Sequence, residues 1–377
     1  MAEVDGGWRL AAVMAGVLVL LLGPGAARPA PRAQAPMHAV LITLDGVRPQ
    51  EIFGGMDEAV LRSVSRDEAI AKTAAYRKYW APTAEARRRR VMPFFWGTLM
   101  RAAGSIAGNA ARGSRFGVTN RMKFSYPGYA EILTGAPHDA TIDSNDDRRY
   151  PYLTVLEFLR TRLDLAPREV AVFASWQTFH WIAAHEEHAV TVNAGYDPYE
   201  TPTPEVAALS RAQFDALTPW DSARHDAFTF SFAMDYLERE RPRVLYVALD
   251  ETDDWAHDKN YERVLDALHR VDRELETLWT WLQGDPEYRD RTAILITADH
   301  GRGLTPDDWS THGKDVAGAE RTWLAAIGPD WPRRGEWTDA PAAATSQVAA
   351  TLARALGEDF RAAVPEAGAP IAYLWPQ

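Results

Sequence analysis

The 377-residue chain has ordinary apolar and charged fractions, 46% and 25%, which predict a globular protein built on one large domain. Its formal net charge of −11 argues against a nucleic acid as a structural partner. The chain has no cysteine, which excludes disulfides, thiolate metal ligands and a lipoprotein anchor. A bound metal would therefore sit on His, Asp, Glu or hydroxyl groups.

An apolar segment and a linker open the chain. Arg9 precedes the apolar run 10–22, and small residues follow it, including Ala26 and Ala27. A basic flank, a short apolar run and small residues are typical of a secretory signal. We therefore expect residues 1–27 to be a signal peptide, with an uncleaved N-terminal membrane anchor as the alternative, and residues 28–36, rich in Pro and Ala, to be a linker. This predicts an exported protein, periplasmic or secreted, with membrane attachment only if the segment stays uncleaved.

Predicted strands and helices alternate after residue 36. Short apolar segments rich in β-branched residues predict strands at His38–Leu44, Glu169–Ala174, Arg243–Leu249, Thr292–Thr297 and Thr322–Ile327. Helical spacing of apolar residues predicts helices at Met92–Ala103, Val155–Leu163 and Tyr261–Leu282. The alternation predicts an α/β domain over residues 37–377, with a mostly parallel central sheet between helices. Residues 176–242 are less regular, and we expect a small insertion or cap there.

Three of the predicted strands run directly into acidic residues. Asp45 follows "AVLITL", the cluster 250–254 follows "VLYVAL", and Asp299 with His300 follows "AILITA". Ligands of such sheets bind beyond the carboxyl ends of the strands, so these groups are expected to meet at one edge. Charges beside buried strands are costly unless they are paired, and a divalent cation would pair them. For any one cluster taken alone, a solvated loop is the alternative.

The cluster after the third predicted strand contains a spacing that suits a metal. Asp253 and His257 are four residues apart, which places them on one face of a helical turn. Asp254 is the alternative ligand because it lies three residues from His257, whereas Asp250 and Glu251 are less well placed. The remaining acids of this stretch are Asp250, Glu251, Asp254 and Asp258. We expect them to lie at the start of the helix, to support the metal ligands by hydrogen bonds, or to be solvated.

Two further segments supply histidines. Adjacent Asp299 and His300 point in different directions from an extended backbone, so they can serve two neighbouring metals. His312 in "STHG" offers another imidazole on a loop, where a solvated side chain is the alternative.

The segment "KFSYPGYAEILTG" (123–135) predicts a helix start beside a serine. Pro127 suits the first turn of a helix, and Gly135 suits its end. Ser125 then lies at the helix N-terminus, where backbone N–H groups and the helix dipole favour an anion such as a phosphate or an alkoxide. An ordinary N-cap is the alternative role for this serine.

Together these motifs resemble the alkaline phosphatase superfamily, and most closely its nucleotide pyrophosphatase/phosphodiesterase-like branch. The resemblance runs from "LITLDG" to "THG" and implies the fold of that superfamily, with a nucleophile at Ser125 and two divalent metals, zinc or alternatively manganese. It also implies the partners of these groups. One metal would be held by Asp253, His257 and His312, the other by Asp45, Ser125, Asp299 and His300, and the phosphate by Asn145 and the backbone N–H of Tyr126.

The nucleophile segment departs from the patterns of this superfamily. The branch usually has Thr-x-Pro-Asn-His, whereas this chain has Ser-Tyr-Pro-Gly-Tyr at 125–129. In sulfatases an Arg stands where Tyr129 stands here, so formylglycine chemistry is not expected. Aromatic residues lie close to the motifs, and we expect one or two to line the pocket, with core packing as the alternative: Tyr126, Tyr129, Trp255 and Trp309.

The sequence therefore predicts an exported, metal-dependent hydrolase of small-molecule phosphate esters, of the phosphodiesterase/pyrophosphatase kind. A phosphomonoesterase, phosphonate hydrolase or phosphotransferase of the same superfamily is the near alternative. A non-catalytic metal- or ligand-binding relative is the alternative of a different class.

Overall fold

The computed structural model describes residues 1–2, 37–65 and 69–375. The predicted signal peptide and linker thus lie outside the described residues, apart from the first two. No helix within the described ranges is long and apolar enough to cross a membrane.

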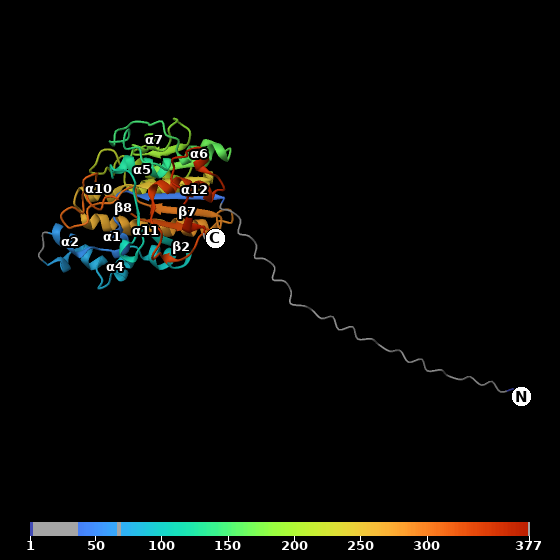
Figure 1. Cartoon of the computed structure of the whole chain (residues 1–377), viewed down its shortest axis with the longest axis horizontal. Coiled ribbons are helices and arrows are strands. Elements are labelled where there is room, and N and C mark those ends of the chain that lie inside the picture. The colour runs from blue at the N-terminus through green and yellow to red at the C-terminus, as the bar shows by residue number, and fades with distance from the viewer. Residues whose placement is uncertain (3–36, 66–68, 376–377) are drawn as a thin grey trace. The chain divides into compact units, whose positions relative to one another are not determined.

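An eight-stranded sheet forms the centre of the domain (Figure 1). Its strand order is β10-β2-β9-β7-β1-β6-β4-β5. Neighbouring strands are parallel except at β9, which runs antiparallel to both β2 and β7. The strands are β1 His38–Leu44, β2 Gly104–Ala107, β4 Val170–Ala174, β5 Thr191–Ala194, β6 Val244–Leu249, β7 Thr292–Thr297, β9 Leu324–Ile327 and β10 Gly335–Glu336. The predicted α/β fold with a mostly parallel sheet is confirmed.

The predicted strand 322–327 is in fact two short strands in different sheets. β8 (Arg321–Thr322) pairs with β3 (Phe116–Gly117) in a three-stranded sheet that also contains β11 (Ala343–Ala344). The chain passes from this sheet into the large one at Trp323, which is fully buried and donates a hydrogen bond to the carbonyl oxygen of Val47 over 3.1 Å. The apolar pattern of the sequence does not reveal this change of partner.

Helices cover both faces of the large sheet because its side chains alternate between two cores. On β1, residues 40, 42 and 44 belong to one core, and residues 39 and 41 to the other. The first face carries α1 Pro49–Gly54, α2 Glu58–Val64, α3 Ala74–Tyr79, α4 Ala84–Val91, the π-helix η2 Phe95–Ala103, α9 Asp226–Glu240, α10 Glu251–His257 and α11 Tyr261–Gly284.

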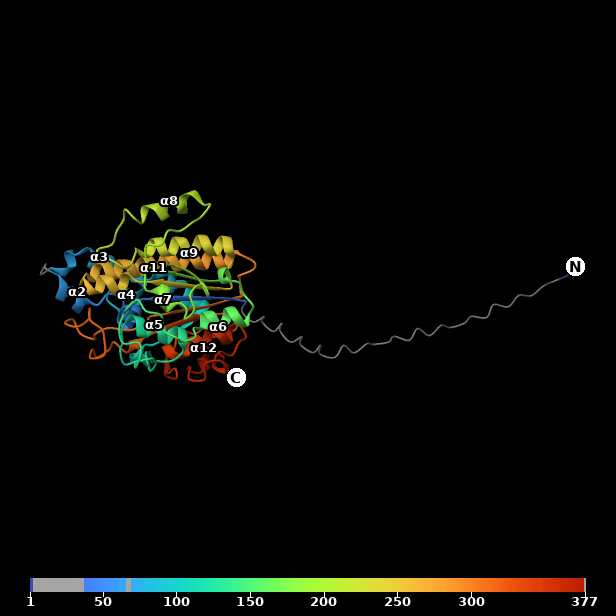
Figure 2. The same ribbon diagram turned by 90° about the horizontal axis from the view of Figure 1, so that it is seen from above.

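The second face carries α5 Ser125–Thr134, α6 Val155–Arg162, α7 Phe179–Ile182 and α12 Val348–Ala355. Figure 2 shows α9 and α11 on one side of the sheet and α5, α6 and α12 on the other. Short 3-10 helices complete the described elements: η1 Ile70–Lys72, η3 Ala110–Arg112, η4 Pro167–Glu169, η5 Thr345–Gln347, η6 Phe360–Ala362 and η7 Ala372–Leu374.

The region 176–242, expected as an insertion or cap, contains parts of the central sandwich. β5 pairs with β4 as the edge strand, and α9 packs against β4 and β6. The expectation therefore does not hold for these two elements. β5 has only four residues, and Phe228, Phe230 and Phe232 alternate along α9, which hides its helical period. Between them α8 (Pro204–Ala212) projects beyond α9 in Figure 2.

Candidate active site

The carboxyl ends of three adjacent parallel strands bring the predicted acids together. β7, β1 and β6 are neighbours in the sheet, and Thr43 of β1 is in register with both Ala248 and Thr297. The chain segments that follow these strands, with Asp45, Asp250 and Asp299, therefore leave the sheet at the same edge. The structure places all the predicted metal-ligand side chains around this edge.

The first ligand group lies on α10 and on the loop after β7. His257 Nε2 is 3.0 Å from Asp253 Oδ2 and 2.9 Å from His312 Nε2. One donor atom from each of these three residues lies within 4.8 Å of the others. Burial, followed by the charge of His300, lowers the pKa of His312, which favours the neutral imidazole that can donate an electron pair to a metal.

The second ligand group surrounds His300. Its Nε2 is 3.3 Å from Asp45 Oδ1, 3.4 Å from Asp299 Oδ2 and 3.4 Å from Ser125 Oγ. Asp253 Oδ1 lies 3.8 Å from the same nitrogen, so the Asp253 carboxylate connects the two groups.

The second group contains buried acids that a metal cation could bind. Asp45 and Asp299 are buried, and Asp45 Oδ1 and Asp299 Oδ2 have no hydrogen-bond partner among the described residues. Burial, followed by repulsion from Asp45, raises the pKa of Asp299 to about 8. Burial alone would lower the pKa of His300, but Asp299 and Asp45 outweigh it and raise this pKa to about 9. Unpartnered carboxylate oxygens beside imidazole nitrogens fit divalent metal ions.

Ser125 is the first residue of α5, and it is not the cap of that helix. The N-cap residue is Phe124, and Ser125 Oγ is directed toward His300. Gly128, in place of the usual Asn of the phosphodiesterase branch, allows close packing here. A Cβ at this position would lie 2.4 Å from the carbonyl oxygen of Asp299. Gly128 thus allows α5 to lie directly against the backbone of Asp299.

The predicted phosphate-binding residues lie beside the serine. Asn145 Oδ1 accepts a hydrogen bond of 2.9 Å from the backbone N–H of Tyr126. The Tyr126 hydroxyl donates to the carbonyl oxygen of Arg148, which ties the same loop to α5 a second time. The backbone N–H of Tyr126, predicted from the family resemblance to bind the phosphate, is therefore engaged with Asn145 in this structure.

A cleft of about 510 Å³ opens in front of Ser125 and Asn145. Four carboxylates line it besides that of Asp253, and no described lining residue is Lys or Arg. Those carboxylates belong to Asp146, Asp147, Asp250 and Asp254. The aromatic residue in the described lining is Trp176, and none of the four expected from the sequence is there. Tyr129 and Trp309 are buried instead, as core packing requires.

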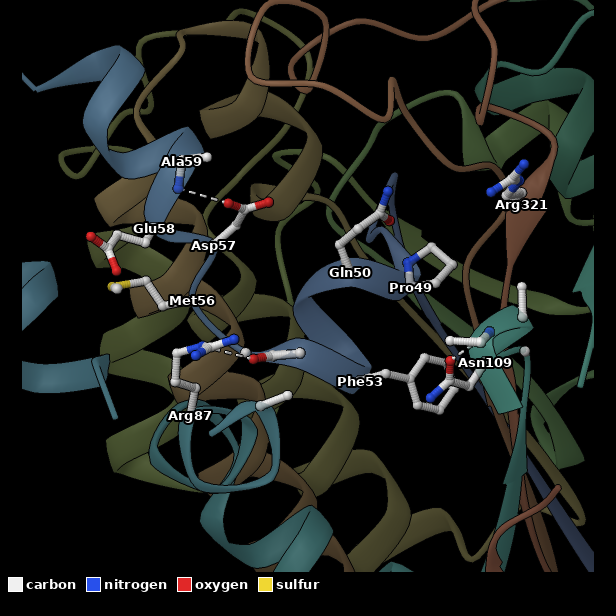
Figure 3. Close-up of a pocket in the computed structure, with 16 residues that line it drawn as sticks. Pro49, Gln50, Phe53, Met56, Asp57, Glu58, Ala59, Arg87, Asn109 and Arg321 are labelled. Carbon is white, nitrogen blue, oxygen red and sulfur yellow. Dashed lines mark hydrogen bonds between the residues drawn. The ribbon is translucent and has the colours of Figure 1, made fainter. Parts of the chain in front are cut away.

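A larger cavity of about 670 Å³ lies elsewhere and contains none of the predicted site residues. Figure 3 shows Arg87 on one side of this cavity and Asn109 and Arg321 on the other. The chemistry of the side chains, and not the size of the cavity, therefore locates the candidate active site.

The sequence interpretation did not identify the supporting contacts made by three residues. The buried guanidinium of Arg302 donates to the carboxylate of Asp253 and to the carbonyl oxygen of Ser310. The Tyr129 hydroxyl donates to Asp45 Oδ2 over 2.9 Å. Thr252 Oγ1 donates to the carbonyl oxygen of Asp45 over 2.7 Å. Arg302 directly follows "DHG" in the sequence, but no local pattern tells which carboxylate it reaches.

The α/β fold and the site are those of the alkaline phosphatase superfamily. Residues 72–367 match the model of the type I phosphodiesterase/nucleotide pyrophosphatase family, so the chain belongs to that family. The match leaves out β1 and Asp45. The protein is therefore an enzyme that hydrolyses phosphate esters, and metal dependence is typical of its superfamily.

Solved structures support the fold at low sequence identity. A mutant of the alkaline phosphatase PafA matches with a TM-score of 0.58 and 10% identity, over 92% of this chain and 100% of that one. A phosphonate monoester hydrolase from Silicibacter pomeroyi matches with a TM-score of 0.53 and 14% identity, over 90% of this chain and 76% of that one. A protein of the alkaline phosphatase superfamily from Vibrio parahaemolyticus matches with a TM-score of 0.51 and 12% identity, over 88% of this chain and 69% of that one. No curated protein matches the chain.

Proposed function

We propose that the protein is an exported phosphodiesterase that uses Ser125 as its nucleophile beside two divalent metal ions, with zinc preferred over manganese. The observation that carries this proposal is the position of Ser125 Oγ, 3.4 Å from His300 Nε2 and at the N-terminus of α5. The two ligand groups adjoin it and share Asp253. The small-molecule substrate would enter through the 510 Å³ cleft.

The residues of the chain divide the chemical work. Two divalent cations, when bound, would supply Lewis-acid stabilisation of the oxygen charges. The N-terminus of α5 favours the ionised form of Ser125. In-line attack forms the Ser125 Oγ–P bond and breaks the P–O bond to the alcohol, which leaves and takes a proton from solvent. Water then attacks the phosphorus of the resulting phosphodiester between Ser125 and the remaining alcohol, breaks the Ser125 Oγ–P bond, releases the phosphate monoester and returns a proton to the serine. Asn145 would hold a non-bridging oxygen throughout.

The charge of the cleft supports a diester over a monoester. At neutral pH a monoester carries nearly one more negative charge than a diester, and the carboxylates of Asp146 and Asp147 line the cleft without a Lys or Arg among the described lining residues. A phosphonate monoester is a single anion like a diester, so phosphonate monoester hydrolysis is the second candidate. The similar fold of the Silicibacter pomeroyi enzyme is consistent with it.

One comparison of substrates tests the proposal. The mature chain is purified, its metal content is measured, and hydrolysis of bis-p-nitrophenyl phosphate, p-nitrophenyl phenylphosphonate and p-nitrophenyl phosphate is compared. We expect about two zinc ions per chain and the highest kcat/KM for the diester. Ser125→Ala is expected to lower kcat by at least ~10³-fold. Ser231→Ala, on α9 and away from the cleft, is the matched control.

Each alternative has its own result in this experiment. A preference for the monoester would assign the same site to a phosphatase, and a preference for the phosphonate would select the second candidate. Absence of both metal and hydrolysis would favour the non-catalytic relative. Export is tested separately by locating the full-length chain after cell fractionation and by sequencing the N-terminus of the mature form.

A further inference from the structure

A second polar cavity lies behind the helix that carries Asp253 and His257. It has a volume of about 600 Å³ and is bordered by α3, α4, α10 and α11. Five of its lining residues are Lys or Arg and two are Asp or Glu, which gives a formal lining charge of +3 (5 − 2) with neutral His. This is opposite in sign to the −11 of the whole chain. The cavity is therefore a local positive region on an acidic protein.

The two acids of the cavity already have partners. Asp266 Oδ1 accepts hydrogen bonds from the Tyr79 hydroxyl over 2.6 Å and from Lys78 Nζ over 3.0 Å. Glu251 accepts from His225 Nδ1 over 3.0 Å and from Arg270. Neither acid is left to neutralise the other cations of the cavity.

Three arginines of the cavity form no ion pair with the described residues. Within the described part of the chain, no carboxylate lies at ion-pair distance from Arg90, Arg263 or Arg273. The Arg263 guanidinium lies 5.9 Å from the centre of the Trp255 ring, a contact that leaves its positive charge uncompensated. These are the charges that an anionic ligand would meet.

The spacing of the arginines suits a ligand with more than one charge. Arg263, Arg270 and Arg273 are at positions i, i+7 and i+10 of α11, close to one face of the helix. At 1.5 Å per residue, the outer two are separated by about 15 Å along the axis. Arg90 contributes from α4. Solvated arginines are common on exposed helices, but these four border one concave space from two helices.

We propose that this cavity binds a small anion with two or more negative charges, held by Arg90, Arg263 and Arg273. It is separate from the catalytic cleft, with which it shares no lining residue. Trp255 of the cavity packs edge-on against Trp220 at 4.8 Å, and the loop of Trp220 continues to Ser222 in the cleft wall. The anion is free in solution or is the headgroup of a lipid, and both present the same charges.

Naphthalene trisulfonate is a suitable probe because it carries three negative charges, is not hydrolysed by a phosphoesterase and binds metals weakly. Its binding to the metal-loaded full chain is measured by calorimetry at low and at moderate salt. We expect Arg90→Glu and Arg273→Glu each to weaken binding at least ~10-fold and added salt to weaken it further. Arg89→Glu is the matched control, because Arg89 is exposed beside Arg90 on α4 but does not line the cavity. It should change the affinity less than ~2-fold.

A second arm identifies the source of the anion. Sedimentation with phosphatidylcholine vesicles that contain phosphatidic acid is compared between Arg90→Glu and Arg89→Glu. Loss of vesicle binding with Arg90→Glu alone supports the site and assigns it to a headgroup, whereas loss of probe binding alone assigns it to a soluble anion. No binding in either arm, or equal losses with both variants, would overturn the proposal. An unchanged Tm verifies folding of each variant, and the Gln variant of the same arginine replaces any Glu variant that fails this check.

Discussion

Asp253 has a different environment at each of its two carboxylate oxygens. Oδ2 lies 3.0 Å from His257 Nε2, while Oδ1 lies 3.8 Å from both His300 Nε2 and His312 Nε2 and accepts from Arg302. Its neighbour Gly46 has φ +59°, and a Cβ there would lie 2.7 Å from Oδ1. Glycine at position 46 thus provides room for the carboxylate that joins the two ligand groups.

Tyr129→Phe should weaken metal binding with little loss of stability. The Tyr129 hydroxyl donates to Asp45 Oδ2 and leaves Oδ1 directed at His300. Without this hydrogen bond the carboxylate can rotate, and removal of such a supporting group usually lowers metal affinity 10–100-fold. We expect a similar fall in zinc affinity, measured by competition with a chelator, and a free energy of unfolding lower by about 1 kcal/mol.

Tyr246→Phe is the control for this experiment. Tyr246 is also fully buried, and its hydroxyl is 3.0 Å from Thr43 Oγ1 and is not bonded to a ligand carboxylate. It should lose comparable stability and keep its zinc affinity. If both variants lost zinc equally, the effect would come from general loosening of the core and not from Asp45.

At the scale of elements, the position of α10 depends on a carboxylate from another helix. Asp226, the first residue of α9, accepts hydrogen bonds from the backbone N–H of Asp250 over 2.8 Å and of Glu251 over 3.2 Å. Ser175, which follows β4, donates to the same carboxylate over 2.6 Å. Asp226 thereby caps the helix that carries Asp253 and His257.

Asp226→Asn is expected to disturb the first ligand group in particular. An amide has only one acceptor oxygen for the two N–H groups and the hydroxyl that the carboxylate now serves. The free energy of unfolding should fall by about 1–2 kcal/mol, and one of two bound metal ions should be lost first. Metal content during dialysis against a weak chelator gives the measurement. Asp235→Asn is the control, because Asp235 lies on the same helix but binds Tyr199, Thr203 and Arg239. Equal metal loss in both variants would contradict the capping role.

The sequence predicts the strands whose ends carry the site better than it predicts their surroundings. β1, β6 and β7 are long, continuously apolar and buried on both faces, so their pattern is visible. The alternation of aromatic residues hides α9, and the four residues of β5 are too few to show a period. Among the site groups, motif spacing and the family resemblance together identified the ligand candidates. Arg302 lies 49 positions from its partner Asp253 in the sequence, and Tyr129 lies 84 positions from Asp45. Only the fold brings such supporting groups to their partners.

The whole molecule concentrates negative charge at one edge of its sheet. Asp45, Asp253 and Asp299 are all buried there, with the cations Arg302 and His300 beside them. The chain as a whole has a formal net charge of −11, so distant charges do not reduce the electrostatic cost of burying these acids. Without metal ions, protons must supply the missing positive charge, and metal binding should therefore depend on pH across the neutral range.

Metal ions should stabilise the fold more strongly as the pH rises. In the metal-free chain the pKa of Asp299 rises from 3.8 to about 8 and that of His300 from 6.5 to about 9. Both groups bind more protons when folded. Their contribution to stability is therefore complete below the unfolded-state pKa and is lost as the pH rises through the folded-state pKa. Between about pH 4 and 9 these two groups thus contribute progressively less to the stability of the metal-free protein, while bound cations take over from the protons.

We expect the difference in Tm between zinc-loaded and chelator-treated protein to be larger at about pH 8.5 than at about pH 6. Asp299→Asn removes one of the two titrating groups and should flatten this dependence. Asp143→Asn, an exposed change on the loop of Asn145, should behave like the wild type. A Tm difference that stayed constant or shrank with rising pH would mean that protons and metal ions do not compete at this edge. The carboxylates would then be neutralised in another way, and the assignment of the second ligand group would fail.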